Sequence, residues 1–327
     1  MDRGITQWIG SKMNILVVPT IREDCIKEFL KAWKKSPESW DEIIVVEDNP
    51  KKTFDLDVKY HLSWEDIEND LGEHAWIISR RDSAIRSYGF LKAFEMGADY
   101  IFTLDDDCYP VEGEHFVHNH ICNIEETTRW AFSIPDMRTR GVPYDNLGKL
   151  TNVVMNVGLW QGVPDLDAVT CLYKDTKDFM PPSFSRVMAR DQYFPLCGMN
   201  LCFKRGIIPL CYFPLMGKDQ PFNRFDDIWF GIIAQKVCSH LGWNITLGRP
   251  HIHHIKASDK FKNLQREASG IGANETFWQM IDKIKLKGKT PVECMKEIAL
   301  YLMTEKDYFG KLGQAIDIWA DMFNQPE

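Results

Sequence analysis

Short apolar runs alternate with helix-like segments over the first 110 residues, and this alternation most limits how the chain can fold. Each apolar run has the length of a buried strand, and the intervening segments carry apolar residues at helical spacing. We expect strands at 14–20, 43–46 and 100–104, a further short strand at 76–79, and helices at 21–35, 64–71 and 83–96. This order predicts an α/β unit with a mainly parallel sheet.

The rest of the chain shows no repeat, low-complexity segment or linker. Residues 130–230 are rich in Pro, Gly and aromatic residues, which indicates strands and long loops that cover a site. Residues 275–327 return to helical periodicity. The 327 residues therefore predict one large domain over 1–274, with a helical C-terminal extension over 275–327 packed on it.

Composition narrows the class of protein. Hydrophobic residues make up 44% and charged residues 26%, which is ordinary for a globular chain. The net charge of −8 argues against a nucleic-acid binder, which would usually be basic. No run reaches the ~18 apolar residues of a membrane span, the N-terminus has no apolar signal core, and the nine cysteines form no CxxC pair. We therefore expect a cytoplasmic protein with reduced thiols.

Polar side chains follow three of the expected strands, at the edge where parallel sheets bind ligands. The groups are Pro19, Thr20 and Arg22 after the first strand, Glu47 and Asp48 after the second, and Asp105, Asp106 and Asp107 after the third. Three adjacent carboxylates repel one another, and a divalent ion with oxygen ligands would relieve that repulsion. The alternative is a solvated acidic turn, but its position after a buried strand favours a metal site.

Three histidines lie within four residues in the second half of the chain: His251, His253 and His254. In an extended segment His251 and His253 share one face and His254 lies on the other, so the three cannot all bind one ion. One of them would complete a carboxylate site, and Lys256, on the same face as His254, would reach a phosphate. The competing interpretation is a partly buried, hydrogen-bonded histidine.

A second acidic pair, Asp226 and Asp227, precedes a segment with helical periodicity. A carboxylate here would contact a substrate hydroxyl or act as a base. The structural alternative is that Asp226 caps the helix.

Three arginines, Arg80, Arg81 and Arg86, surround an expected helix start that Asp82 or Ser83 would cap. The positive end of a helix together with arginine side chains suits a diphosphate. Surface salt bridges explain the same pattern equally well. The segment 138–143 indicates no more than a surface turn.

Ordered sequence blocks extend over residues 14–280. They are Val18–Arg22, Asp82–Ala84 with Arg86 and Gly89, Tyr100–Cys108, Arg140–Gly141, Gly158–Trp160, Pro164–Ala168, Phe194–Leu201, Gln220–Pro221 with Arg224–Trp229, His254–Ser258 and Phe261–Leu264. Together these blocks resemble the reversibly glycosylated polypeptide family, the UDP-arabinopyranose mutases. The resemblance implies an α/β, GT-A-like (Rossmann-like) fold in which a mixed, mainly parallel sheet is flanked by helices.

The same resemblance implies a UDP-sugar ligand, dependence on Mn²⁺ or Mg²⁺, and interconversion of UDP-arabinopyranose and UDP-arabinofuranose with reversible glycosylation of an arginine. Asp105, Asp107 and His254 would then bind the metal, and Arg140 would be the glycosylated residue. The remaining predicted ligand-binding residues are Pro19, Thr20, Arg22, Glu47, Asp48, Arg81, Asp82, Arg86, Asp106 and Lys256.

An arginine nucleophile suits a change of ring size, because nitrogen attack gives a glycosylamine whose lone pair can expel the ring oxygen. The open-chain iminium can then close through another hydroxyl. The guanidinium pKa lies above ~12, so a carboxylate must remove a proton as attack proceeds. Asp165, Asp167 and Asp226 are candidates for this base. The predicted catalytic residues are Arg140, Asp165, Asp226 and Asp227.

Two other functions fit the same residues. A metal-dependent glycosyltransferase would pass the sugar to an external acceptor. A non-catalytic UDP-sugar-binding subunit would dock on a partner enzyme through the C-terminal helices, whose Tyr301, Phe309, Ile316 and Trp319 otherwise pack on their own domain or on a second copy. A homo-oligomer and a hetero-oligomer are both compatible with the sequence.

Overall fold

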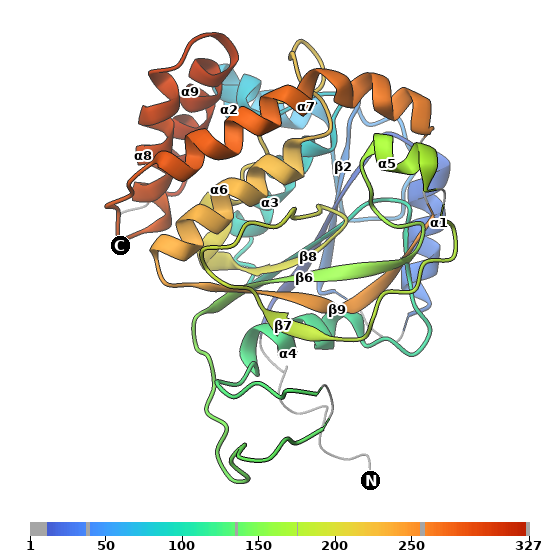
Figure 1. Ribbon diagram of the computed structural model, residues 1–327. Helices are drawn as coiled ribbons and strands as arrows, with labels where there is room; N and C mark the ends of the chain where they lie inside the picture. Colours follow the sequence, from blue (N-terminus) through green and yellow to red (C-terminus); the bar gives the residue numbers. More distant parts are fainter. Residues whose placement is uncertain (1–11, 37–39, 135–136, 175, 256–258, 325–327) are drawn as a thin grey trace.

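One mixed sheet, with helices on both faces, forms the centre of the molecule (Figure 1). The computed structural model describes residues 12–36, 40–134, 137–174, 176–255 and 259–324. Within these residues nine strands form the sheet, in the order β3-β2-β1-β4-β8-β6-β9-β5, and β7 pairs with β9. The α/β class and the mixed sheet flanked by helices are therefore confirmed.

The N-terminal half of the sheet is parallel. It contains β1 (Asn14–Thr20), β2 (Glu42–Glu47), β3 (Tyr60–Leu62) and β4 (Tyr100–Leu104). The connecting helices are α1 (Glu23–Lys34), α2 (Trp64–Leu71), the 3₁₀ helices η1 (Gly72–Ile77) and η2 (Ser83–Ile85), and α3 (Arg86–Glu95). The strand expected at 76–79 is wrong, because η1 occupies residues 72–77. A short apolar run does not distinguish a strand from a buried helical turn.

The second half of the sheet turns antiparallel at β8 (Asn200–Lys204), which pairs with both β4 and β6 (Val153–Gly162). Next to β6 lies the parallel β9 (Asn244–His254), flanked by β5 (Cys108–Pro110) and β7 (Ser185–Val187). The helices of this half are α4 (Phe116–Glu125), α5 (Ala168–Tyr173), η3 (Arg205–Leu210) and α6 (Asp226–His240). Because β4 and β6 both oppose β8, the carboxyl ends of β1, β2, β4, β6 and β9 lie at one edge.

Alternate residues of β1 supply two apolar layers on opposite faces of the sheet. Leu16 and Val18 pack with residues of α1 and α4, whereas Ile15 and Val17 pack with residues of α3 and α6. Gly89 lets α3 approach β1 closely, because a Cβ at this position would lie 2.4 Å from Val17 Cγ1.

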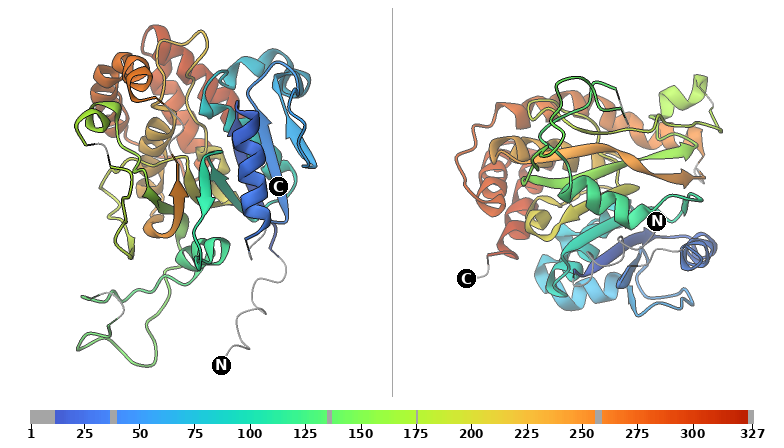
Figure 2. Two further views of the ribbon diagram at one scale, coloured as in Figure 1. Left: turned by 90° about the vertical axis from the view of Figure 1, so that its right-hand side faces the viewer. Right: turned by 90° about the horizontal axis from the view of Figure 1, so that it is seen from below.

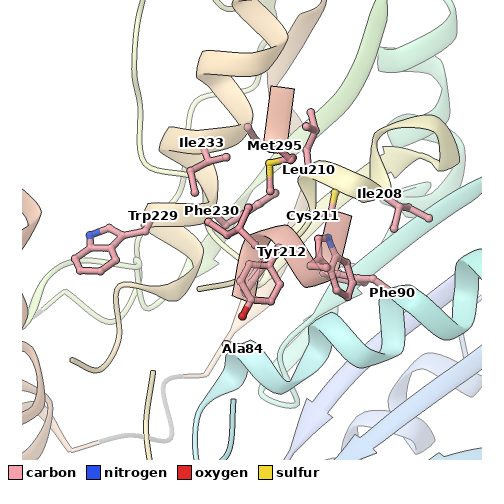
Figure 3. Packing of buried hydrophobic residues seen from close by; sticks show 14 of the residues in the cluster. Ala84, Phe90, Ile208, Leu210, Cys211, Tyr212, Trp229, Phe230, Ile233 and Met295 are labelled. Atoms are coloured by element: carbon pink, nitrogen blue, oxygen red, sulfur yellow. The ribbon is translucent and has the colours of Figure 1, made fainter. Parts of the chain in front are cut away.

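The C-terminal helices α7 (Lys260–Lys283), α8 (Pro291–Met303) and α9 (Asp307–Asp321) extend the second of these layers. In Figure 3, Met295 of α8 lies with Leu210, Tyr212 and residues of α6 in one cluster. Trp319 of α9 is fully buried and donates its Nε1 hydrogen to the carbonyl of Pro209 at 3.1 Å. These apolar side chains therefore pack on their own chain, and α7 runs across the position between 274 and 275.

Candidate functional site

The predicted strand-end residues meet at one edge of the sheet, where Thr20, Asp48 and Asp105 follow neighbouring parallel strands. Arg22 holds two of the acidic residues there. Its Nη2 forms an ion pair with Asp106 and lies 3.3 Å from Asp107 Oδ2. Thr20 Oγ1 also donates to Asp106 Oδ2 at 2.6 Å. Burial raises the pKa of Asp106 even though Arg22 opposes that shift.

His254 lies beside Asp107 in an orientation typical of a metal ligand. Its Nδ1 is 2.7 Å from the carbonyl oxygen of Val163, which can only accept, so Nδ1 carries the hydrogen. In the neutral ring Nε2 is then an acceptor, and it lies 3.8 Å from Asp107 Oδ1. A histidine anchored to a carbonyl, with its other nitrogen beside a carboxylate, fits a divalent cation. The expected facing is confirmed, since His254 is buried while His251 and His253 are half-buried on the other face of β9.

Asp105 pairs with Arg86, which is 1% exposed. Arg86 also donates from Nη1 to Thr103 Oγ1 at 2.8 Å and from Nε to the Ser83 carbonyl at 3.1 Å. Burial would raise the pKa of Asp105, but Arg86 outweighs burial and holds it below its usual value. Arg86 therefore lies beneath the carboxylates as part of the core, where sequence reasoning expected a diphosphate contact.

A second group of carboxylates adjoins this edge, at the start of α6 and before α5. Ser83 Oγ donates to Asp226 Oδ2 at 2.7 Å, and the Gly198 amide donates to Asp227 Oδ2 at 3.0 Å. Cys197 Sγ donates to Asp165 Oδ2 at 2.9 Å. In the described part of the chain, one oxygen each of Asp165 and Asp227 and the Cys197 sulfur lie within 4.8 Å of one another. The trio predicted for the metal, Asp105, Asp107 and His254, is not gathered this closely, because Asp105 turns to Arg86.

The pKa values of Asp82, Asp226 and Asp227 are raised, because these carboxyl groups are buried and lie close to one another. Burial raises the pKa of Asp226 above its usual value. Burial, and then repulsion by Asp226 and Asp165, raises the pKa of Asp227 further. Burial and repulsion by Asp226 likewise raise the pKa of Asp82, whose Oδ1 accepts from the Ala84 amide at 3.1 Å and so caps η2. Carboxyl groups with raised pKa values are suited to accept and return protons.

Asp82→Asn is expected to stabilise the protein by about 1 kcal/mol at pH 7. The folded protein binds a proton at Asp82 more tightly than the unfolded chain, so this carboxylate costs stability as pH rises above about 4. The Asn variant keeps the oxygen that caps η2. Urea unfolding from pH 4 to 8 should show a gap that widens with pH. As a control, Asp167→Asn should be less stable than wild type by an amount that is nearly constant above about pH 5, since hydrogen bonds from Thr170 outweigh burial and lower that pKa.

The two predicted residues after β2 have different roles. Glu47 is fully buried, and its oxygens accept from the Thr53 amide at 3.0 Å and from Asn49 Nδ2 at 2.7 Å. Glu47 therefore holds the loop after β2. It does not contribute to the candidate site, by which we mean the carboxylates Asp105–Asp107, Asp165, Asp226 and Asp227 with His254. Asp48 accepts from Trp64 Nε1 at 2.7 Å and from the Asp82 amide at 2.9 Å, which ties the ends of β2 and η2 together.

Arg81 lies at the rim, exposed, with a left-handed backbone (φ 58°). Its guanidinium stacks 5.2 Å from the centre of the Trp64 ring, and Arg80 and Lys218 lie 5.5 Å from the same ring. This basic rim beside acidic residues was only partly anticipated, because Trp64 and Lys218 carry no motif of their own.

Arg140 is not brought to the candidate site. It is exposed on a projection that we call the arm, described over residues 128–134 and 137–149, which leaves the sheet after α4 and returns to β6 (Figure 1; Figure 2, left). Glu125, at the end of α4, bonds Tyr100 and Lys204, the first residue of β4 and the last of β8. The base of the arm is therefore at the edge opposite Asp105.

The remaining predicted residues separate into three cases. Pro19 is buried within β1, opposite Val46. Asp167 accepts from the Thr170 amide at 3.0 Å and caps α5. Of the three candidate bases, Asp165 and Asp226 therefore remain in the candidate site. Lys256 lies outside the described residues. Sequence reasoning missed Ser83 and Cys197 as partners of these carboxylates, although Cys197 stands in the block Phe194–Leu201.

The topology and the side-chain contacts define an α/β protein with a group of carboxylates at the carboxyl ends of its strands. The family model described as reversibly glycosylated polypeptide matches residues 11–327. The chain belongs to this family. UDP-arabinopyranose mutase 1 of Arabidopsis thaliana is 34% identical over 340 residues, covering 95% of this chain and 92% of that protein. Probable UDP-arabinopyranose mutase 1 of Pisum sativum is 33% identical over 335 residues, covering 95% and 90%.

Solved structures are similar at a lower level. TarS of S. aureus in complex with UDP-GlcNAc is 12% identical, with a TM-score of 0.46 over 95% of this chain and 72% of that one. Glucosyl-3-phosphoglycerate synthase of Mycobacterium tuberculosis, with Mn²⁺, UDP and glucosyl-3-phosphoglycerate, is 12% identical, with a TM-score of 0.40 over 83% and 78%. Similarity this low carries no functional inference. Among the described residues, no helix has both the length and the apolar character to cross a membrane.

Proposed function

We propose that this protein is a UDP-sugar mutase, an isomerase that interconverts UDP-arabinopyranose and UDP-arabinofuranose or a related pair. The observation that carries the proposal is the grouping of side chains at the carboxyl edge of the sheet. It sets the Asp107–His254 pair beside a group of carboxyl groups with raised pKa values, in a chain whose relatives over nearly the full length are named mutases.

A divalent cation, Mn²⁺ or Mg²⁺, fits Asp107 and His254, with Asp105 and Asp106 next to them. When bound, such an ion supplies positive charge to a diphosphate and favours its departure. Arg22, which already bridges Asp106 and Asp107, lies where it would add a second positive charge to the phosphates. The basic rim of Arg80, Arg81 and Lys218 around Trp64 would hold the nucleotide's anionic part on the side of β2.

The proton transfers are assigned to the carboxylates of α6 and their neighbour Asp165. In the proposed step a nitrogen of Arg140 forms a bond to the anomeric carbon. The bond from that carbon to the diphosphate oxygen breaks, and its electron pair leaves with UDP. The proton lost by the guanidinium goes to Asp226, Asp227 or Asp165 and is returned when UDP attacks the rearranged sugar.

Arg140→Lys and Arg140→Ala are expected to lose at least about 100-fold of the radiolabel that the wild-type chain takes up from a UDP-sugar, because the covalent nitrogen is removed or displaced. Arg138→Lys, on the same arm, is the matched control and should label normally. Full labelling of either Arg140 variant would exclude Arg140 as the glycosylated residue. UDP binding, measured in parallel, should stay unchanged in all three variants, since neither Arg138 nor Arg140 is among the residues assigned to hold the nucleotide.

One observation favours a second candidate function, a metal-dependent glycosyltransferase that uses an external acceptor. Arg140 lies away from the candidate site of its own chain. Product analysis separates the two. A mutase converts pure UDP-pyranose to UDP-furanose with no acceptor present, whereas a transferase releases UDP only when an acceptor is supplied. Absence of any turnover by the pure protein with metal would instead support a non-catalytic UDP-sugar-binding subunit.

Location in the cytoplasm stays a prediction. All nine cysteines lie within the described residues, and none of them forms a disulfide. Seven of the nine are buried, among them Cys197 beside Asp165. Unbridged thiols in this number fit a reducing compartment.

A further inference from the structure

We propose that the arm docks on a second copy of this chain and places Arg140 over the candidate site of that copy. The inference rests on the proposed function for the role of Arg140 and goes beyond it by assigning the nucleophile and the base to different chains. In a two-fold dimer the exchange would be reciprocal, with each arm serving the candidate site of the other copy.

The arm carries an unusual amount of uncovered apolar surface. Tyr144 is 83% exposed and Met137 59%, and Trp130, Phe132 and Ile134 are also exposed. Figures 1 and 2 show the arm extending from the body, and among the described residues no helix or strand lies along it. Large apolar side chains gathered on one projection mark a surface that is covered by a partner.

Hydrogen bonds between the two ends of the arm fix the place where it leaves the body. This place is at the edge of the sheet opposite the candidate site. Thr128 forms a bridge with Lys149, and the Arg129 amide donates to the Gly148 carbonyl at 3.2 Å. The Leu150 amide donates to the Thr127 carbonyl at 2.8 Å. Gly148 is required in this turn, because it adopts φ 61° and its Cα faces the Arg129 side chain. To reach the candidate site of its own chain the arm would have to fold back along the length of the strands, against the direction in which it projects.

Charge favours the candidate site of a second copy as the docking place. Residues 128–149 contain four Arg or Lys and two Asp, in a chain whose net charge is −8. The candidate site gathers Asp165, Asp226 and Asp227 around the start of α6, with one oxygen each of Asp165 and Asp227 and the Cys197 sulfur within 4.8 Å of one another. A guanidinium would relieve the repulsion among these carboxylates. Arg140 lies twelve positions after Thr128, which gives the arm a reach of about 40 Å when extended. That length suffices to reach the candidate site on a facing copy.

Complementation between inactive variants tests the proposal. Arg140→Ala keeps the candidate bases but has no nucleophile. A triple variant with Asp165→Asn, Asp226→Asn and Asp227→Asn keeps the nucleophile but has none of the candidate bases. Neither should take up label alone. An equal mixture, with one variant carrying a mass tag, should regain label at Arg140 of the triple variant, in up to about half of its chains. A mixture that stays as unlabelled as its components, after time for subunit exchange, would overturn the proposal.

Self-association gives a second readout that does not need catalysis. Trp130→Ser with Tyr144→Ser removes exposed apolar surface from the arm and should weaken association at least about 10-fold by light scattering over a dilution series, while UDP binding stays unchanged. Ile271→Ser with Leu300→Ser, at exposed positions on α7 and α8, is the matched control and should associate like wild type. A wild-type chain that is monomeric throughout the series overturns the proposal. Wild-type chains that associate through the arm but take up no label would refute the proposed function and leave the docking surface standing.

Discussion

Replacing Asp107 with Asn is expected to weaken UDP binding in the presence of Mn²⁺ by about 100-fold or more, because ligand loss costs at least as much as loss of an outer partner. His254→Gln should behave in the same way, since its Nε2 faces Asp107 Oδ1 at 3.8 Å. His253→Gln is the matched control, because that ring lies on the opposite face of β9. Calorimetric titration of each variant with UDP, with and without the metal, measures the effect.

The same titration without metal makes the prediction sharper. A carboxylate near a diphosphate repels it, so Asp107→Asn should bind UDP as well as wild type, or better, once the cation is removed. The sign of the effect therefore reverses with metal. If Asp107→Asn and wild type bind UDP equally in Mn²⁺, the acidic residues after β4 do not hold a cation against the nucleotide.

Arg86→Met is expected to lower the free energy of unfolding by about 3 kcal/mol, the lower end of the cost of breaking a buried ion pair. The change leaves Asp105 without its cation and also removes donors from Thr103 Oγ1 and the Gly198 carbonyl. Lys59→Met, which breaks the exposed pair with Glu42, is the comparison and should cost less than about 1 kcal/mol. Urea unfolding at pH 7 compares the two variants with wild type.

A second variant separates charge from packing in this result. Asp105→Asn in the Arg86→Met background should recover about 1 kcal/mol, because it removes the unpaired carboxylate. If the double variant is no more stable than Arg86→Met alone, the loss comes from the cavity and the unsatisfied carbonyl, and the ion pair with Asp105 contributes little.

Features of this fold that depend on residues close together in the sequence could be predicted. The runs at β1, β2 and β4 are buried on both faces, so they appear as continuous apolar stretches, and the acidic residues after β4 are adjacent in sequence. The facing of His254 followed from the alternation of side chains in a strand. Each of these inferences depends on neighbours a few residues apart.

Other features depend on contacts between distant segments, which local patterns do not contain. Arg86 looks like a surface cation at a helix start, and only the approach of Gly198, 112 positions later, makes it part of the core. The pairing of Cys197 with Asp165 joins two loops in the same way. The place of Arg140 follows from the insertion of β8 between β4 and β6, because that strand order decides at which edge the long connection after α4 emerges.

Helix α7 has a consequence for attempts to shorten the protein. A chain ending at residue 274 would stop in the middle of Lys260–Lys283 and would lose Phe277 and Ile281, which are fully buried, together with Trp319 beneath Pro209. Residues 275–327 are thus not an independent domain, because their buried side chains form part of the hydrophobic core. Truncation before them should yield insoluble or protease-sensitive material in place of a smaller working enzyme.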